Sequence, residues 1–424
     1  MRFCKMSIKA FEQLKSLRGS MNYRSFGKLN WKVSVLGFGT MRLPIVGADP
    51  ANINEPEAIR MIRYAIDHGV NYVDSGYLYH GGNSEVLIGK ALKDGYREKT
   101  KIATNMPTWR VKSQQDMDKY LNEQLMRLQT ESVEFYLLHG IDKYLWTKLL
   151  KLNVLDWMEK KKLEGKIKHI GFSFHDQCTV FKEIIEGYDK WDFCQIQYNY
   201  MDTAFQAGTE GLKYAASKGL GVVIMEPIAG GRLAIPPPKD IQALWDSSEV
   251  KRTPAEWALK WVWNHPEVSV VLSGMSTMEQ VVENVESASH AVPNDLTKQE
   301  LELINQVRQK YEQLGFVACT GCRYCMPCDQ GVNIPEIIAL YNEYYLKNRA
   351  SEIQSKYRKH IAPENEAKRC IRCGKCEDQC PQKIPIRNVL SDAVLIFEQT
   401  PRRTAIGQLR HLAGLALRKM KLKR

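Results

Sequence analysis

Short runs rich in β-branched and aromatic residues alternate with longer amphipathic segments from about residue 33 to residue 290. Runs of about four to eight such residues predict buried strands, and apolar residues recurring three and four positions apart predict helices. The predicted strands are 33–38, 70–74, 101–104, 133–139, 167–173, 193–197, 220–225 and 268–273. Eight strands, each followed by a helical segment, predict an α/β fold of the closed (β/α)8 TIM barrel type and not an open doubly wound sheet.

Glycines refine this prediction. Gly27 separates two short runs within residues 23–32, which predicts a hairpin across the bottom of the barrel. Gly69 and Gly219 follow helical segments and precede strands, where a glycine commonly ends a helix. The loop 228–240 after the seventh strand is long and rich in Gly and Pro, so we expect it to contact a cofactor or a substrate.

Composition narrows the protein class. The 424 residues are 44% hydrophobic and 25% charged, which is enough to bury a barrel core and a smaller second domain. No apolar run reaches the length of about 18 residues that a membrane span needs, and the N-terminus has no apolar signal core. We therefore expect a cytoplasmic protein without a transmembrane span.

The net charge of +12 comes from the two ends of the chain. Residues 1–20 and 401–424 together hold 13 Lys or Arg and one acid, so the rest of the chain is neutral. A neutral body argues against binding of nucleic acid. Apolar residues near helical spacing in 401–424 predict either a solvated helix or a weak peripheral contact with an anionic membrane or partner.

Eight of the eleven cysteines form two runs near the C-terminus. They are Cys319, Cys322, Cys325 and Cys328, followed by Cys370, Cys373, Cys376 and Cys380. Clustered thiols in a chain without a secretion signal indicate metal and not disulfides. The second run has the C-x2-C-x2-C-x3-C-P pattern of [4Fe–4S] proteins, whereas a zinc site needs only two cysteine pairs. We predict two [4Fe–4S] clusters, with zinc or a mixture of zinc and iron–sulfur sites as the alternative.

The fourth cysteines of the two runs are predicted to exchange clusters. Cys328 and Cys380 are followed by similar residues, which indicates equivalent roles. In two-cluster ferredoxins the fourth cysteine of a run ligates the other cluster. One cluster would then use Cys380 with the first three cysteines of the first run, and the other Cys328 with the first three of the second. The helical stretch 335–361 between the runs resembles the α-helical type of dicluster ferredoxin.

Four regions are therefore expected. They are a basic N-terminal extension (1–21), the barrel (22–300), an α-helical ferredoxin-like domain (301–400) and a basic amphipathic tail (401–424). Either Met1 or Met21 could be the natural start.

Three residues with catalytic chemistry lie at predicted strand ends. Asp74 ends the second strand, Tyr79 follows five residues later, and His139 ends the fourth strand, on the face that carries the active site in such barrels. With the strand count, these residues resemble the aldo/keto reductase family over about residues 22–290. With the cysteine runs, the chain resembles the bacterial members that carry a C-terminal iron–sulfur domain. The resemblance implies that Tyr79 is the general acid in carbonyl reduction, that His139 orients the carbonyl, and that Asp74 pairs with a lysine.

The lysine of the family is replaced here by Asn105. A free phenol has a pKa of about 10, so Tyr79 can still donate a proton at neutral pH, whereas alcohol oxidation needs the phenolate that a nearby cation stabilises. We therefore expect slower turnover that is biased towards reduction. If Asp74 is buried, we expect its pKa to be raised, or its carboxylate to accept a hydrogen bond from the Asn105 amide. A site that has lost hydride chemistry is the alternative.

The resemblance also implies a nicotinamide dinucleotide bound without a Gly-rich Rossmann turn. The residues matching the family's cofactor contacts are Ser173, Gln195, Met225, Gly274, Met275, Ser276, Gln280, Glu283 and Asn284. Ser173 and Gln195 match residues that hold the carboxamide. Gly274 and Gln280 replace bases that commonly hold the 2′-phosphate of NADPH, so NADH is at least as plausible as NADPH. Met225 replaces a stacking aromatic residue, which leaves a flavin open.

Two functions are compatible with these residues. The first is an oxidoreductase that reduces a small aldehyde or ketone with NAD(P)H, its cysteine domain being structural or a link to a ferredoxin or another redox partner. The second is a ferredoxin-coupled electron-transfer protein whose barrel binds a flavin, the usual converter between one-electron and hydride chemistry, or serves as a scaffold. The intact Asp74, Tyr79 and His139 favour the first function, which we prefer; Asn105 and Met225 favour the second. Aromatic residues at predicted strand ends either line a substrate pocket or cap the core; they are Tyr77, His80, Trp109, Tyr198 and Tyr200.

Overall fold

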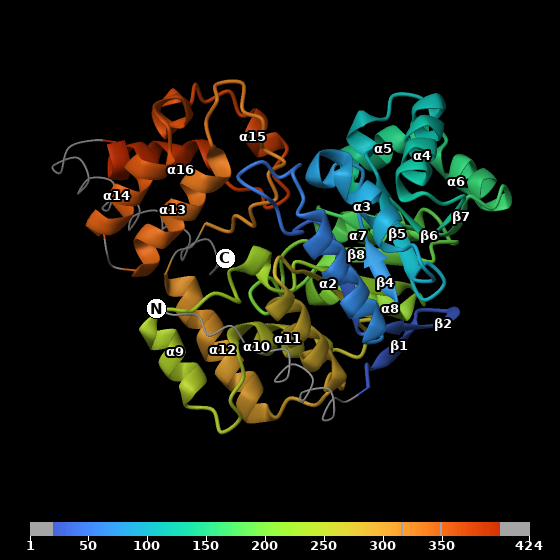
Figure 1. Ribbon diagram of the computed structural model, residues 1–424, viewed down its shortest axis with the longest axis horizontal. Coiled ribbons are helices and arrows are strands. Elements are labelled where there is room, and N and C mark those ends of the chain that lie inside the picture. The colour runs from blue at the N-terminus through green and yellow to red at the C-terminus, as the bar shows by residue number, and fades with distance from the viewer. Residues whose placement is uncertain (1–19, 315–316, 348–349, 399–424) are drawn as a thin grey trace. The chain divides into compact units, whose positions relative to one another are not determined.

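The structure, a computed structural model, describes residues 20–314, 317–347 and 350–398 (Figure 1). The chain divides into two compact units. The first extends to Pro227 and takes in Glu256–Thr297, and the second holds Ile228–Ala255 and the residues from Lys298 onward. The predicted tail 401–424 lies outside the described residues, as does the predicted N-terminal extension up to residue 19.

The first unit is built on a closed ring of parallel strands. They are β3 (Leu36–Gly39), β4 (Tyr72–Asp74), β5 (Lys101–Met106), β6 (Val133–Ile141), β7 (Ile167–Phe174), β8 (Phe193–Gln197), β9 (Gly221–Met225) and β10 (Val270–Gly274). The last strand closes the ring on the first, with Val271 opposite Leu36. The predicted TIM barrel is confirmed.

An antiparallel hairpin precedes the barrel, formed by β1 (Tyr23–Phe26) and β2 (Leu29–Ser34). Gly27 lies in its turn with φ +53°, and a Cβ there would be 2.3 Å from the backbone nitrogen of Gly221, so only glycine fits. The predicted first strand, 33–38, was wrong in one respect. It joins the end of β2 to most of β3, because the apolar run continues through the bend at Val35 that separates them.

Aromatic side chains fill the barrel where its strands begin. The ring of Phe26, from the hairpin, lies 4.9 Å from Phe135, 5.7 Å from Phe193 and 6.0 Å from Tyr72, measured between ring centroids. All four side chains are completely buried. This end of the barrel is therefore closed by packing, which leaves the carboxyl ends of the strands for chemistry.

Helices follow the strands around the barrel (Figure 1). They are α2 (Glu55–Asp67), α3 (Asn83–Ala91), α4 (Gln114–Leu128), α5 (Lys143–Lys151), α6 (Val154–Leu163), α7 (Cys178–Glu186), α8 (Gly208–Ser217), α10 (Pro254–Trp263) and α11 (Met278–Ser289). A capping box formed by Ser113 and Asp116 begins α4. Gly69 and Gly219 end α2 and α8 with φ of +96° and +76°, as predicted. The short α5 was not predicted.

The second unit is largely helical. Its helices are α9 (Lys239–Asp246), α12 (Lys298–Gln313), α13 (Ile334–Lys347), α14 (Ala350–His360), α15 (Lys375–Asp378) and α16 (Ile386–Ala393), and the last is followed by a π-helical turn at Val394–Glu398. Helices α13, α14 and α16 pack together, in orange to red in Figure 1, around a buried core that includes Ile337, Tyr341, Leu390 and Phe397. The predicted helical stretch 335–361 corresponds to α13 and α14.

The loop 228–240 lies within the second unit. A Cβ on Gly230, which has φ +67°, would be 2.6 Å from the Cα of Thr320, and Arg232 Nη1 donates a hydrogen bond to the carbonyl of Val317 at 3.3 Å. The loop expected to contact a cofactor or substrate thus packs against the start of the first cysteine run. Among the residues that the structure describes, no helix is long and apolar enough to cross a membrane.

Candidate active site and cluster-binding loops

The predicted catalytic residues of the barrel lie at the carboxyl ends of neighbouring strands. Asp74 is the last residue of β4, Asn105 is the penultimate residue of β5, and His139 lies two residues before the end of β6. Tyr79 begins the short helix η2 (Tyr79–Gly82) that follows β4. Because parallel strands end at the same edge of a barrel, the fold brings these four residues to one end.

The rings of Tyr79 and His139 are in contact. Their centroids are 6.0 Å apart in an edge-to-face arrangement, with an interplanar angle of 81°. Trp109 belongs to the short helix η3 (Thr108–Arg110) and is 39% exposed. The centroids of its ring and the His139 ring are 5.2 Å apart. The predicted acid, the predicted imidazole and one predicted pocket residue therefore form a single aromatic group.

His139 is neutral in the fold. Burial, with a smaller effect of the nearby His175, lowers the pKa of His139 to about 3. Its backbone carbonyl accepts a hydrogen bond from the Thr108 hydroxyl at 2.5 Å, which ties β6 to the loop that carries Trp109. A neutral imidazole can donate an N–H to a carbonyl oxygen without bringing a charge into the site.

Asp74 and Asn105 form no hydrogen bond with each other among the described residues. Asp74 is 3% exposed, burial raises its pKa well above the usual value, and its Oδ2 has no hydrogen-bond partner among the described residues. The Asn105 amide donates to the backbone carbonyl of Ser75 at 2.7 Å. The expected rise in the pKa of Asp74 is confirmed, and the alternative, a hydrogen bond from Asn105, is wrong, since among the described residues the amide donates to the Ser75 carbonyl and not to Asp74.

The residues expected to hold a carboxamide lie on neighbouring strands. Ser173 Oγ accepts a hydrogen bond from the backbone N–H of Gly140 at 2.7 Å, so its own hydroxyl hydrogen can be donated. Gln195 is 3% exposed, and its amide nitrogen lies 3.8 Å from the sulfur of Met225. The Gln195 Oε1 is buried and has no partner among the described residues. An orphaned buried acceptor is costly, so this oxygen points to a ligand that brings an N–H.

The turn between β10 and α11 is ordered by its own side chains. Ser276 donates its backbone N–H to Gln280 Oε1 at 2.7 Å and its hydroxyl to the Arg42 carbonyl at 2.8 Å. A Cβ on Gly274 would lie 3.3 Å from Cβ and Cγ of Arg42, so the aliphatic part of this arginine packs on the turn. Asn284, expected to contact adenine, is buried and donates to Ser273 Oγ at 2.9 Å.

Two further residues, Met275 and Glu283, were expected at the phosphate turn and near the adenine. Met275 is 1% exposed, in the protein core, and Glu283 is partly buried on α11.

Four aromatic residues expected in the pocket make contacts elsewhere. The Tyr77 hydroxyl donates to Glu123, and the His80 ring bonds the backbone of Leu43 and Pro50. Tyr198 bonds Thr209 and His265, and Tyr200 packs on Trp261. Trp109, by contrast, contacts the His139 ring.

The two cysteine loops share one backbone shape. In the first, Gly321 and Arg323 flank Cys322 with φ of +66° and +65°, and in the second, Arg372 and Gly374 flank Cys373 with φ of +58° and +87°. Alternating left-handed residues turn successive N–H groups to one side, a concave arrangement that binds anions and iron–sulfur clusters. The loops therefore fit clusters that are held by both thiolates and backbone.

The Cys325 thiol lies near thiols of both cysteine runs. Burial, with the nearby Cys322, Cys319 and Cys380 thiols, raises the pKa of Cys325 to about 12. Burial, with the nearby Glu377 carboxylate and the Cys370 and Cys373 thiols, likewise raises the pKa of Cys376 to about 11. Packed against the apolar core, these thiols would be neutral without a metal, and iron would convert them to thiolates.

A cluster and a single ion need different arrangements of thiolates. In a [4Fe–4S] cluster each thiolate ligates a different iron, whereas four cysteines of a zinc site surround one ion. Within the described ranges, no three or more Cys, His, Asp or Glu side chains form a group that could hold one metal ion.

Comparison with known proteins decides the family. The model of the aldo/keto reductase family matches residues 35–309, which is more than half of the chain. The chain belongs to the aldo/keto reductase family. A model described as a 4Fe-4S dicluster domain matches residues 318–384, so this aldo/keto reductase carries an iron–sulfur domain after its barrel, as predicted.

Known aldo/keto reductases and their relatives match the barrel over nearly their whole length. An uncharacterized oxidoreductase of Bacillus subtilis is 26% identical over 328 residues, covering 68% of this chain and 96% of the relative. The L-galactose dehydrogenase of Arabidopsis thaliana is 25% identical over 313 residues, covering 69% and 95%. The structure of an aldo-keto reductase from Bacillus halodurans in its holo form is 28% identical, with a TM-score of 0.57 over 68% of this chain and 96% of its own.

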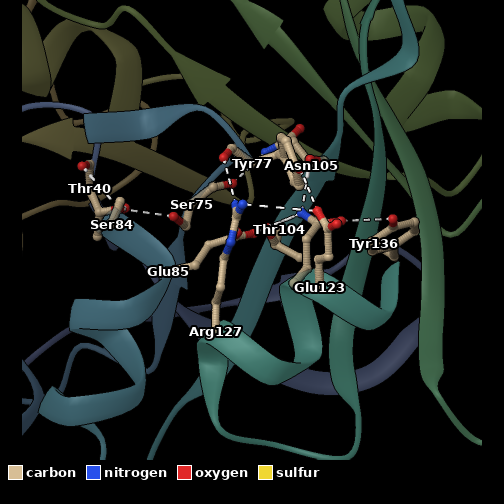
Figure 2. Close-up of polar contacts among 11 residues, drawn as sticks. Thr40, Ser75, Tyr77, Ser84, Glu85, Thr104, Asn105, Glu123, Arg127 and Tyr136 are labelled. Carbon is tan, nitrogen blue, oxygen red and sulfur yellow. Dashed lines mark hydrogen bonds and ion pairs between the residues drawn. The ribbon is translucent and has the colours of Figure 1, made fainter. Parts of the chain in front are cut away.

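Two arginines of this aldo/keto reductase escaped the sequence analysis. Arg42 follows β3 and reaches the turn at Gly274, and Arg127 on α4 reaches the loop that carries Tyr79 (Figure 2). The only signal for Arg42 was its position four residues after a predicted strand end. Arg127 lay on a predicted helix with no sign that its side chain turned inward.

Proposed function

We propose that this aldo/keto reductase reduces a small aldehyde or ketone with NADPH or NADH, and that its second unit holds two [4Fe–4S] clusters. The observation that carries the proposal is the contact between the Tyr79 phenol and a buried, neutral His139 at the carboxyl ends of the strands. This arrangement joins a proton donor to an uncharged hydrogen-bond donor, which is what a carbonyl oxygen needs as it gains negative charge.

The chemistry assigns a separate task to each ring. The His139 N–H binds the carbonyl oxygen and orients the substrate, with the exposed Trp109 beside it as part of the pocket wall. The Tyr79 hydroxyl donates its proton to the same oxygen, and the new O–H bond completes the alcohol. A bound nicotinamide dinucleotide would supply the hydride to the carbonyl carbon.

The residues present fit a nicotinamide dinucleotide. The orphaned Gln195 Oε1 can accept an N–H of the carboxamide, and the Ser173 hydroxyl can donate to its oxygen. At the other end, the turn at Gly274–Ser276 precedes the N-terminus of α11, where phosphate groups are favoured. The aliphatic part of Arg42 packs on this turn, which supports Arg42 as a base for the 2′-phosphate in place of those absent at Gly274 and Gln280.

The cysteines are assigned to two clusters. We assign Cys319, Cys322, Cys325 and Cys380 to one cluster, and Cys370, Cys373, Cys376 and Cys328 to the other. The proximity of Cys325 to Cys380 supports the first set. Each cluster transfers single electrons, so the clusters either stabilise the second unit or exchange electrons with a partner such as a ferredoxin.

The functional limits of the parts are also proposed: a barrel over about 22–300 that is interrupted by Ile228–Ala255, and a cluster domain over about 301–400. The packing of the loop 228–240 against the first cysteine run supports assigning this loop to the cluster domain.

A second function is supported by Asn105, which replaces the lysine of the family, and by Met225. Met225, at the end of β9, offers no aromatic face to a nicotinamide, which supports a barrel that binds a flavin or acts as a scaffold for electron transfer. Both functions use the same cysteine ligands, so they differ only in what the barrel binds.

One anaerobic preparation of the full chain tests the proposal. We expect about eight iron and eight sulfide per chain, no flavin absorbance, saturable binding of NADPH or NADH, and reduction of a panel of aldehydes and ketones. Retained flavin without nicotinamide binding would replace the first function by the second. A matched Arg42→Met variant should bind the dinucleotide more weakly, and a loss confined to NADPH would place the guanidinium at the 2′-phosphate.

A further inference from the structure

The segment that carries Tyr79 is held in place by side chains from other elements. The Thr40 hydroxyl donates to the Asp74 carbonyl at 2.8 Å, and the Asn105 amide donates to the Ser75 carbonyl at 2.7 Å. Arg127 Nη1 donates to the Tyr77 carbonyl at 3.0 Å (Figure 2). Three backbone carbonyls within four residues are thus bound by side chains, and Tyr79 follows the last of them by two residues.

Arg127 touches this segment on both sides of Tyr79. Its guanidinium lies 4.3 Å from the centre of the Tyr77 ring, before Tyr79. After Tyr79, a Cβ on Gly82 would lie 3.2 Å from Arg127 Nη1, so the backbone at this glycine packs directly on the guanidinium. A planar, charged group in contact with both ends of a short loop restricts where the side chain between them can point.

A buried acid holds Arg127 in this position. Glu85, on α3, is completely buried, and its Oε2 lies 3.2 Å from Arg127 Nη1. Its Oε1 accepts hydrogen bonds from the Thr104 hydroxyl at 2.6 Å and the Gln124 amide at 2.8 Å. Burial raises the pKa of Glu85, and its hydrogen bonds and Arg127 oppose that rise.

The same network reaches Asn105. Gln124 also donates to the Asn105 carbonyl at 3.0 Å, and its own carbonyl accepts from the Tyr136 hydroxyl at 2.9 Å (Figure 2). The network therefore connects the end of β5 with the loop after β4. A buried ion pair is not needed to stabilise a barrel, because apolar residues of similar size often do so as well or better.

We propose that Arg127 and Glu85 are positioning residues that hold Tyr79 against His139, so that the phenol is aimed at the substrate before the substrate arrives. This inference rests on the proposed carbonyl reduction. It explains how Tyr79 stays in place although the usual lysine is absent: Asn105 and Arg127 fix the backbone of its loop through carbonyl oxygens.

The chain offers a matched control. Arg97 and Glu134 form a second ion pair in the barrel, with 3.0 Å between Nη2 and Oε2. The side chains of this pair are 27% and 5% exposed, against 22% and 0% for Arg127 and Glu85. Glu134 lies at the start of β6, at the end of the barrel opposite Tyr79. Loss of either arginine should therefore cost similar stability, and only loss of Arg127 should disturb Tyr79.

The test compares Arg127→Met with Arg97→Met in the full-length holoprotein. We expect Arg127→Met to lower kcat for carbonyl reduction about 10- to 100-fold, since a misplacement of about 1 Å can cost a factor of 100, with KM for the dinucleotide unchanged. Arg97→Met should lower the melting temperature by a similar amount and leave kcat within about twofold. Equal kcat losses in the two variants would overturn the inference.

A double-mutant cycle separates positioning from general damage. If Arg127 acts through Tyr79, then Tyr79→Phe should cost much less in the Arg127→Met background than in the unmodified protein. An equal cost in both backgrounds would refute a positioning role even if Arg127→Met is slow.

Hydrogen exchange keeps the two proposals distinguishable. The N–H groups of Tyr79 and Gly81 bond the carbonyls of Gly76 and Leu78 at 3.0 and 3.1 Å. Arg127→Met should speed exchange in residues 75–82, and Arg97→Met should not. If the protein reduces no carbonyl but this difference is seen, the proposed function fails and the ordering of the loop stands. If it reduces carbonyls and exchange is unchanged, the positioning inference fails alone.

Discussion

The barrel site and the cysteine loops are built from different parts of the chain. In the barrel, Asp74, Asn105 and His139 are buried side chains on strands that hydrogen bonds hold in register. In the cysteine loops, left-handed residues beside Cys322 and Cys373 shape the backbone around thiols. Strand pairing needs no ligand, whereas the cysteines are neutral thiols that become cluster ligands only when iron displaces their protons. The barrel site is therefore preorganised, and the cluster site depends on its metal.

The largest effect expected on the barrel side comes from removing the phenol. Tyr79→Phe deletes the proton donor but leaves the ring in contact with His139, so carbonyl reduction should fall about 10²- to 10⁴-fold with little change in stability. Steady-state kinetics and thermal unfolding measure both quantities. The iron content should not change, and undiminished turnover would show that Tyr79 is not the acid.

The next largest effect is expected in the cysteine loops, where substitutions should remove iron without affecting the barrel site. Cys380→Ser and Cys328→Ser should each remove one cluster, about half of the iron, because each takes one thiolate from a different set of four. The remaining cluster, identified by its EPR signal, should differ between the two variants.

The barrel should be unaffected by either cysteine substitution. Dinucleotide binding is expected to persist while unfolding of the second unit shifts to lower temperature. If both variants lose the same EPR signal, the proposed exchange of fourth ligands is wrong.

A smaller effect is expected when the lysine of the family is restored. In Asn105→Lys, the ammonium can pair with Asp74 and stabilise the Tyr79 phenolate, so alcohol oxidation relative to carbonyl reduction should rise about tenfold at neutral pH, the equivalent of one pKa unit. The ratio of the two rates, measured on one substrate pair, gives the result. An unchanged ratio would mean that the site does not use the charge of the phenol.

The smallest effect concerns the buried Asp74. Burial raises its pKa in the fold, so the unfolded chain ionises first as the pH rises above about 4. The free energy of unfolding therefore decreases with pH until the folded carboxyl ionises as well. Asp74→Asn avoids this loss and should be more stable by about 1 kcal/mol at pH 7, with no gain near pH 4.

Glu134, in the same barrel, should affect the pH dependence of stability in the opposite direction to Asp74. Burial acts to raise its pKa, but hydrogen bonds from the Ile102 N–H and Arg97 outweigh burial and lower it. Glu134→Gln should therefore lose stability at pH 7 and lose less as the pH falls through the pKa of the folded carboxyl. Denaturant unfolding across pH 4–7 compares the two variants, and the same slope for both would contradict this reasoning.

The sequence predicted most of the framework and only part of the site. Residues 193–197 formed β8 as expected, because an isolated apolar run with clear flanking turns has one good place in a barrel. The cysteine motif and the strand-end positions of Asp74 and His139 were local patterns and were visible. The contact of Tyr79 with His139 could be expected only from the family resemblance.

Contacts between distant segments could not be predicted in the same way. The partner of Asn105 is a backbone carbonyl on the neighbouring segment, and Arg42 meets a turn far along the chain at Gly274. Neither contact leaves a periodic trace. Tyr77 and Tyr198 were assigned to a pocket because aromatic residues near strand ends have no sequence signature that separates pocket from packing; the structure uses them to hold helices.

The seating of Gly230 on Thr320 has a consequence for attempts to cut this protein into pieces. A truncation after about residue 300 would retain every barrel strand. It would also leave the segment 228–255, which belongs to the second unit, without the residues on which it packs. The exposed glycine and proline stretch would then become a target for proteases and for self-association. The two units are interleaved in the chain. Isolating the barrel therefore requires shortening the segment 228–255 as well as removing the C-terminal part.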